Sequence, residues 1–314
     1  MAGDGTVLTR RPVVAVLGAT GSIGMHLVSA FEARGYRVLA VARKRSPLVA
    51  GCEFIELDLS ATPSAEIARI LTAADAPLMV NAAGGWLASL EENRLAHVEV
   101  VERLLGAAAL MPAPPRFVQI GSIHEYGPVP HGAVIDESFE PKPQTPYGLT
   151  KLAGSNAVLR ATRAGHVHGV VLRAVNVFGP GAAGGSFLGS VVRRLRELPA
   201  GDRLRLKVSR SERDFVDVRD LADAVVRATE SAVTGRAVNI GRGEALDMRR
   251  MLELLVVEAG RDPGALELFS GPVDSKGGDW TRADVRLANR LLGWAPTTSV
   301  RQSLRDMWEA AAER

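Results

Sequence analysis

The segment Val13-Val14-Ala15-Val16-Leu17-Gly18-Ala19-Thr20-Gly21-Ser22-Ile23-Gly24 decides the fold of this chain. Five consecutive apolar residues are typical of a strand covered on both faces, and the helical periodicity that follows predicts a strand, a tight turn and a helix. Glycines at these spacings let the turn close, let the backbone approach a pyrophosphate and let the helix pack tightly. The first N–H groups of the helix would attract that anion. The alternative is a tight turn without a ligand. The expected dinucleotide contacts are Gly18, Thr20, Gly21, Ser22, Ile23 and Gly24.

Further short apolar runs continue the same rhythm, with helical stretches between most of them. They occupy residues 36–41, 52–57, 78–81, 117–120 and 169–173. Strands that alternate with helices predict an α/β fold, a Rossmann-type doubly wound parallel sheet. The rhythm breaks after residue 178, which indicates a smaller, interleaved lobe. We expect a flexible tail at 1–11, a cofactor domain at 12–178 plus 213–240, and a substrate-binding lobe at 179–212 plus 241–314.

Composition excludes several classes of protein. The 314 residues are 46% hydrophobic and 23% charged, which is ordinary for a globular chain. The 38 basic and 35 acidic residues give a net charge of +3 and are scattered, so nucleic acid binding has little support. The single cysteine, Cys52, leaves no internal disulfide and no zinc or iron–sulfur site, and we expect no metal. Neither a membrane-length apolar run nor a signal peptide is visible, so we expect no membrane partner and a cytoplasmic location.

The end of the second expected strand indicates which dinucleotide binds. An acidic residue there would accept hydrogen bonds from the ribose of NAD, but the sequence has Ala42 followed by Arg43, Lys44 and Arg45. Three cations suit a 2′-phosphate, so NADP (NADPH) is favoured over NAD. The alternative is a solvated basic turn. Asp58 and Leu59, after the third strand, are placed to flank the adenine, although Asp58 could equally be a helix N-cap.

Tyr147 and Lys151 begin a segment that reads as a helix through about residue 163. Side chains four residues apart lie on one face of a helix, one turn from each other. A phenol is a poor acid near neutrality, but a nearby ammonium and an oxidised nicotinamide both stabilise the phenolate, which makes it a usable proton shuttle. Ser122 follows the strand at 117–120, so its hydroxyl points toward the crevice where ligands of such sheets bind.

Together these residues resemble the extended short-chain dehydrogenases/reductases of the nucleotide-sugar epimerase/dehydratase group. The resemblance implies that Tyr147 is the general acid/base, that Lys151 binds the nicotinamide ribose and lowers the tyrosine pKa, and that Ser122 hydrogen-bonds the reacting oxygen. It also implies cofactor contacts from Ala82, Ala83 and Gly84, and sugar-diphosphate contacts from Asn176, Ser186 and Arg213. For Arg213 a structural ion pair is the alternative. The motifs that carry the resemblance are 18–24, 81–84, Ser122 with Tyr147 and Lys151, 172–180, 213–222 and 292–296.

Departures from that family narrow the reaction. Its 4,6-dehydratases carry an Asp-Glu pair after the hydroxyl residue, where this chain has Ile123 and His124, and isoleucine cannot transfer protons. Its 4-epimerases hold NAD tightly and return the same hydride, whereas the basic turn at 43–45 favours a reductase that takes fresh NADPH. His97 stands where relatives usually have asparagine.

The stretch 122–127 resembles that of 4-ketoreductases, which finish deoxysugar nucleotides for glycosylated natural products. The resemblance implies NADPH-dependent reduction of the C4 ketone of a dTDP-4-keto-6-deoxyhexose, with His124 contacting the sugar or relaying a proton; the alternative is that His124 only orders its loop. An NDP-sugar 4-epimerase with bound NAD and a non-catalytic NADP-binding regulator are the rival functions. Relatives form homodimers through helices that correspond to 147–163 and about 93–109, although an intramolecular contact would give these helices the same apolar faces.

Overall fold

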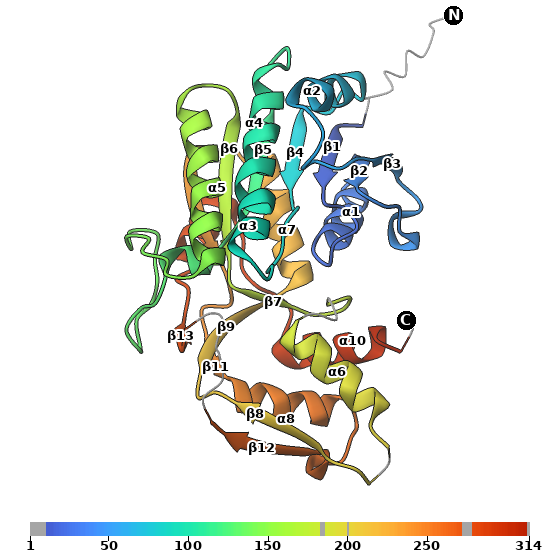
Figure 1. Cartoon of the computed structure of the whole chain (residues 1–314), viewed down its shortest axis with the longest axis vertical. Helices are drawn as coiled ribbons and strands as arrows, with labels where there is room; N and C mark the ends of the chain where they lie inside the picture. The colour runs from blue at the N-terminus through green and yellow to red at the C-terminus, as the bar shows by residue number, and fades with distance from the viewer. Residues whose placement is uncertain (1–10, 183–185, 200, 272–277, 313–314) are drawn as a thin grey trace, which may run out of the picture.

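Seven parallel strands form a central sheet in the larger of the two lobes of the molecule (Figure 1). The computed structural model describes residues 11–182, 186–199, 201–271 and 278–312, so the expected tail at 1–11 lies, apart from residue 11, outside the described part. The strand order is β10-β6-β5-β4-β1-β2-β3, which confirms the predicted doubly wound α/β sheet. The strands are β1 Val13–Leu17, β2 Arg37–Ala42, β3 Glu53–Glu56, β4 Leu78–Asn81, β5 Arg116–Ser122, β6 His168–Ala174 and β10 Arg236–Ile240.

Helices cover both faces of this sheet (Figure 1). Helices α1 (Gly24–Ala33) and α7 (Val218–Glu230) pack together on one face, and α2 (Ser64–Ala73), α4 (Val100–Ala109) and α5 (Pro146–Arg163) cover the other. Short helical turns lie at Pro47–Val49, Ile123–Tyr126 and Pro263–Ala265. In the described part of the chain, no helix is both long and apolar enough to cross a bilayer.

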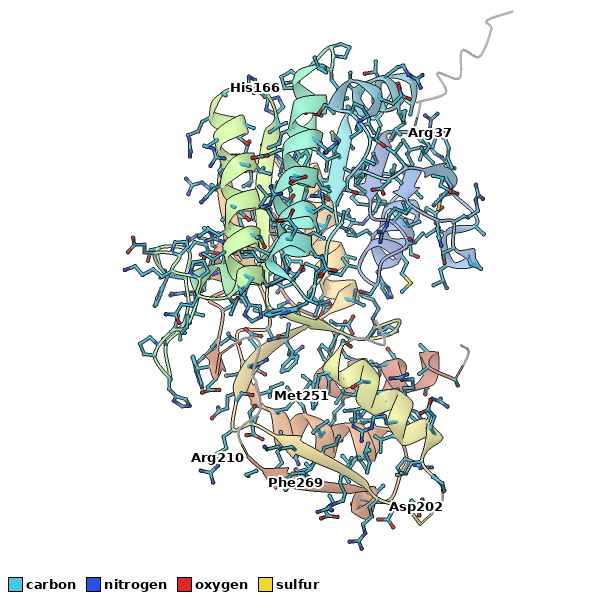
Figure 2. The ribbon with its side chains drawn as sticks, in the orientation of Figure 1. Arg37, His166, Asp202, Arg210, Met251 and Phe269 are labelled. Carbon is cyan, nitrogen blue, oxygen red and sulfur yellow. The ribbon has the colours of Figure 1, made fainter. Side chains whose placement is uncertain are left out.

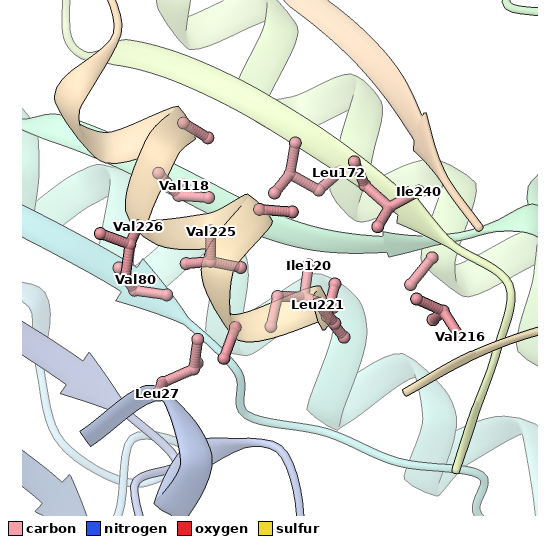
Figure 3. Close-up of a cluster of buried hydrophobic side chains, with 14 of the residues drawn as sticks. Leu27, Val80, Val118, Ile120, Leu172, Val216, Leu221, Val225, Val226 and Ile240 are labelled. Atoms are coloured by element: carbon pink, nitrogen blue, oxygen red, sulfur yellow. The ribbon is translucent and has the colours of Figure 1, made fainter. Parts of the chain in front are cut away.

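Strand alternation explains why both faces are apolar. Val14 and Val16 of β1 enter the core under α1 and α7, whereas Val13, Ala15 and Leu17 enter the core under α2, α4 and α5. Figure 3 shows the first core, where side chains of α7 meet those of the sheet and of α1. Burial on both faces is the reason that the strands read as continuous apolar runs rather than as alternating ones.

The smaller lobe has its own core below the sheet (Figure 1). In Figure 2, Met251 of α8 lies inside this lobe, whereas Phe269 lies on its outer strand. The side chain of Met251 is fully buried and Phe269 is 42% exposed. The lobe contains β7 Asn176–Phe178, α6 Phe187–Glu197, β8 Leu204–Val208, β9 Glu212–Asp217, β11 Ala245–Asp247, α8 Met248–Glu258, β12 Leu266–Ser270, β13 Trp280–Thr281 and α10 Val300–Ala310.

Residues near the C-terminus that were assigned to the substrate-binding lobe contact the cofactor domain. Helix α9 (Arg286–Leu292) and Trp294 pack in the core of the larger lobe, although the sequence groups them with the smaller lobe. The indole Nε1 of Trp294 donates to the carbonyl of Asp220 in α7 at 2.9 Å. The domain division at 179–212 plus 241–314 stays a prediction.

The helix expected at about 93–109 is divided into three segments. Helix α3 (Leu90–Arg94) begins with a capping box between Ser89 and Glu92, a π-helical segment spans Leu95–Glu99, and α4 follows from Val100. In a π segment the backbone hydrogen bonds span five residues instead of four, and such segments often mark functional sites. His97 occupies its middle, with its side chain buried.

Candidate active site

Two adjoining clefts open at the carboxyl ends of the parallel strands, where ligands of such sheets bind. The smaller, of about 260 Å³, is lined by Ser122, Tyr147 and Lys151. The larger, of about 840 Å³, extends over the glycine turn to Arg43 and Lys44. Residues 82–84, which follow β4, line both clefts. Together the clefts bring most of the predicted cofactor and catalytic residues to one continuous surface.

The glycine turn fits a dinucleotide. Gly18 has a φ of +85°, which L side chains rarely adopt, and a Cβ at Gly24 would lie 2.1 Å from the carbonyl oxygen of Gly18. Helix α1 therefore starts against the turn, and it has no side-chain cap and no acidic residue in its first turn. Its start can thus accept an anion. Gly18, Thr20 and Gly21 line the larger cleft, Ser22 and Ile23 line the smaller one, and Gly24 supports the turn from behind.

The three cations after β2 do not share one environment. Arg43 and Lys44 line the larger cleft, whereas the guanidinium of Arg45 lies over the ring of Phe54, 5.1 Å from its centroid. Of the three cations, Arg43 and Lys44 are thus the ones that line this cleft.

Asp58 and Leu59 also line the larger cleft, beside the basic turn. The Asp58 carboxylate accepts hydrogen bonds from the backbone and hydroxyl of Ser60, and these bonds, with the charge of Arg43, lower its pKa. Asp58 is not the helix N-cap that the alternative required, because α2 begins at Ser64 with Pro63 at the cap position.

The catalytic candidates converge from two elements. Thr145 caps α5 by accepting from the N–H of Gly148, and Pro146 opens the helix, so Tyr147 lies in its first turn. Ser122 ends β5, and its hydroxyl lies near enough to the Tyr147 phenol to lower the pKa of that phenol. The Lys151 Nζ donates to the carbonyl of Ile120 at 2.6 Å. The backbone thus fixes all three groups in the smaller cleft.

Burial sets the protonation states of these groups. Burial raises the pKa of Tyr147 to about 12, and the nearby Ser122 hydroxyl acts in the opposite direction. Burial also lowers the pKa of Lys151 to about 8, opposed by the negative charge of Glu125. The lowering of the tyrosine pKa by Lys151 that the resemblance implied stays a prediction, since burial of the phenol is the largest cause of its pKa shift.

Ser122 is held by a residue that sequence reasoning missed. The Glu125 carboxylate accepts from the backbone N–H of Ser122 at 2.8 Å and from the Ser155 hydroxyl at 2.9 Å. The Ser122 hydroxyl in turn accepts from the N–H of His124 at 3.2 Å. The spacing Ser-x-x-Glu was the available signal, because it is the pattern of a capping box.

Aromatic rings enclose the phenol. The indole of Trp86 stacks on the Tyr147 ring with centroids 4.2 Å apart and an interplanar angle of 17°. His124 meets the edges of both rings, at 5.5 Å from Trp86 and 6.0 Å from Tyr147. Burial and the charge of Arg213 lower the pKa of His124 to about 4, so this imidazole is neutral near pH 7. Trp86 was not identified from the sequence. The only available signal was its position shortly after β4, whose carboxyl end lies at the cleft.

The predicted diphosphate contacts are only partly brought together. Asn176 and Ser186 line the smaller cleft, where Asn176 donates to the carbonyl of Asp214 and Ser186 caps α6 by accepting from Gly189. Arg213 lines neither cleft, and its guanidinium donates to the carbonyl of Gly278 at 2.8 Å. In the described residues, no cluster of three or more His, Cys, Asp or Glu side chains could hold a metal ion.

A doubly wound sheet with a glycine turn and a serine, tyrosine and lysine in one cleft defines the extended short-chain dehydrogenase/reductase class. Residues 14–241 match the NAD dependent epimerase/dehydratase family, and the chain belongs to that family.

Known proteins similar to this chain act on nucleotide sugars, according to their names. The dTDP-6-deoxy-L-talose 4-dehydrogenase (NAD(P)(+)) of Kitasatospora kifunensis is 38% identical over 301 residues, 95% of each chain. The GDP-6-deoxy-D-mannose reductase of Pseudomonas aeruginosa is 29% identical over 204 residues, 62% of this chain and 66% of that protein. The structure of MoeE5 in complex with UDP-glucose and NAD has a TM-score of 0.82 and 26% identity, and the match covers 96% of this chain and 99% of that one. This chain is therefore related to NAD(P)-dependent enzymes of nucleotide sugars.

Proposed function

We propose that this protein reduces the C4 ketone of a dTDP-linked 4-keto-6-deoxyhexose with NADPH. The observation that carries the proposal is that Tyr147, Ser122 and Lys151 line one cleft, with the Ser122 hydroxyl near enough to the Tyr147 phenol to influence its pKa. A 4-dehydrogenase of a dTDP-6-deoxysugar, the relative that matches 95% of the chain, interconverts the same two oxidation states at C4. Reduction is that reaction in reverse.

NADPH, when bound, supplies the hydride to C4. Tyr147 keeps its proton near neutrality, because its pKa is about 12, and so can donate that proton to the carbonyl oxygen as negative charge develops there. The Ser122 hydroxyl, held by Glu125 through its backbone, can hydrogen-bond the same oxygen. The products are the C4 alcohol and NADP⁺, and solvent returns one proton to Tyr147.

The pair of residues after Ser122 supports reduction over dehydration. Ile123 is 1% exposed and packs in the core under α7, so it offers the cleft neither an acid nor a base. His124 lines the cleft as a neutral imidazole, which suits a sugar hydrogen bond better than charge stabilisation. Elimination of water from the hexose needs two proton-transfer groups at these positions, and this chain has one at most.

The choice of NADPH rests on Arg43 and Lys44, which line the larger cleft at the end of β2, where an acid would accept the ribose of NAD. Gly18, Thr20, Gly21, Ser22, Ile23 and residues 82–84 would hold the rest of the dinucleotide.

A homodimer through α5 and the helix expected at about 93–109 belongs to the same proposal. Leu95 of the π segment and Leu149 of α5 lie on neighbouring helices, are 38% and 49% exposed, and would be covered in such a dimer. Light scattering at micromolar concentration should give twice the monomer mass, and Leu149→Glu should halve it. A monomeric wild-type protein would contradict the dimer.

The direct test adds NADPH and dTDP-4-keto-6-deoxyglucose and follows the absorbance of the reduced nicotinamide. Steady loss of NADPH with one equivalent of C4 alcohol formed supports the reductase. In a parallel assay with an NDP-hexose that carries a C4 hydroxyl, conversion into its C4 epimer without loss of NADPH would establish the 4-epimerase instead. Binding of NADPH with neither reaction would establish the non-catalytic regulator.

A further inference from the structure

His97 contacts two elements of the candidate site, the turn after β4 and helix α5. It lies in the π segment Leu95–Glu99 and is only 3% exposed. Its Nε2 accepts from the backbone N–H of Gly85 at 3.4 Å, and its Nδ1 lies 3.0 Å from the Thr150 hydroxyl of α5. Gly85 belongs to the turn after β4 that lines the smaller cleft, and Thr150 precedes Lys151. One imidazole therefore joins the turn to the catalytic helix.

The hydrogen bonds assign one tautomer to this ring. Because the Gly85 N–H donates to Nε2, the proton must be on Nδ1, which then donates to Thr150. The Thr150 hydroxyl in turn donates to the carbonyl of Pro146 at 2.9 Å. Burial and the charge of Lys151 lower the pKa of His97 to about 3, so the imidazole is neutral near pH 7. Protonation would remove the acceptor for Gly85.

The residues around His97 also pack closely against it. A Cβ at Gly154 would lie 2.3 Å from the His97 carbonyl oxygen, and a Cβ at Gly84 would lie 2.9 Å from its Cδ2. The His97 ring also meets the Tyr147 ring edge to face, with centroids 5.3 Å apart. Tyr147, Thr150 and Gly154 occupy one face of α5, so this face docks on His97 as a unit.

We propose that His97 is a positioning residue, which sets the distance between the turn at Gly84 and Gly85 and the phenol of Tyr147. Gly84 lines both clefts, so the same turn would contact the dinucleotide. The proposal rests on the proposed reductase function for its catalytic consequence, but the link itself exists without substrate. A shift of about 1 Å between reacting groups can cost about 100-fold in rate, which makes such a link worth holding rigidly.

Three substitutions separate positioning from simple filling of space. In His97→Gln the amide can reach Gly85 but not Thr150, in His97→Asn it can reach Thr150 but not Gly85, and in Thr150→Val the link is broken from the other end. Thr150→Ser keeps the hydroxyl and is the matched control. We expect the first three to lower kcat about 10- to 100-fold with less than threefold change in the KM for the keto-sugar, and Thr150→Ser to stay within threefold of wild type.

The link predicts a pattern of non-additivity. Because each substitution breaks the same connection, His97→Gln combined with Thr150→Val should lose little more kcat than either alone. A residue that only fills space would lower the melting temperature while leaving kcat at 25 °C unchanged. Unchanged kcat in folded His97→Gln and His97→Asn, or full additivity with Thr150→Val, would overturn the proposal.

Two readouts do not depend on turnover. In the wild-type protein, ¹⁵N NMR should show the Nδ1–H tautomer of His97, and the Gly85 amide should exchange its hydrogen at least tenfold more slowly than in His97→Asn. An Nε2–H tautomer or equal exchange rates would refute the link. Failure of the wild-type protein to consume NADPH would refute the reductase instead, so the two failures are distinguishable.

Discussion

Arg173 and Glu125 form a buried ion pair directly behind the candidate site, with 2.8 Å between Nε and Oε2. Their side chains are 6% and 0% exposed. The guanidinium also lies over the ring of Tyr126, 4.5 Å from its centroid. The same carboxylate holds the backbone of Ser122 and the hydroxyl of Ser155 in α5. The pair therefore connects β5, β6 and the catalytic helix.

Glu125→Gln should destabilise the fold by about 3 kcal/mol or more, because it leaves the Arg173 charge buried without its counter-ion. Urea denaturation of wild type and variant measures this loss. The matched control is Glu66→Gln, which breaks an exposed pair with Arg69 and should leave stability almost unchanged. Equal stabilities of wild type and Glu125→Gln would show that the pair contributes nothing.

Arg43→Ala should raise the KM for NADPH about 10- to 100-fold and leave the KM for NADH nearly unchanged, because a charge-assisted hydrogen bond to a phosphate contributes about 1.5–3 kcal/mol. Steady-state kinetics with each cofactor measures the ratio. Arg45→Ala is the control, since Arg45 packs on Phe54 and does not line the cleft. A similar loss with both cofactors, or the same effect from Arg45→Ala, would contradict the assignment of the 2′-phosphate site.

Acid should destabilise the protein through His97 and His124. Folding lowers the pKa of these imidazoles to about 3 and about 4, so between those values and about pH 6.5 the unfolded chain binds protons that the folded chain does not. Stability is therefore fully present above about pH 6.5 and falls as pH decreases, by up to about 1.4 kcal/mol per pH unit for each histidine.

Unfolding measured from pH 7.5 to 4.5 checks this linkage. His124→Asn should reduce the slope of unfolding free energy against pH, because it removes one of these buried imidazoles. The same slope in wild type and His124→Asn would mean that His124 is protonated in the folded state.

The sequence predicted those parts of the fold that depend on local pattern. The apolar run Val13 to Leu17 and the glycines after it specify a covered strand and a helix that starts against it, and the structure has both. The cap at Thr145 and the proline after it likewise set the start of α5. These features could be predicted because the spacing of apolar residues, helix caps and turns each depend on only a few neighbouring residues.

Features that depend on tertiary contact were not predictable in the same way. The stacking of Trp86 on Tyr147 joins residues far apart in the chain, and no spacing encodes it. The π segment at His97 lies where α5 approaches closely at Gly154, a contact that a helical period cannot reveal. Arg213 matched a family motif, but its side chain turns to Gly278 and lines neither cleft.

The central claim is that the Tyr147 phenol donates the proton in a reaction that consumes NADPH. Single-turnover mixing of enzyme, NADPH and dTDP-4-keto-6-deoxyglucose tests it in Tyr147→Phe, with Tyr36→Phe, a tyrosine outside both clefts, as control. We expect hydride transfer about 100- to 10,000-fold slower in Tyr147→Phe, with NADPH binding within about twofold of wild type, because only a general acid is removed. Hydride transfer at the wild-type rate in that variant would contradict the account.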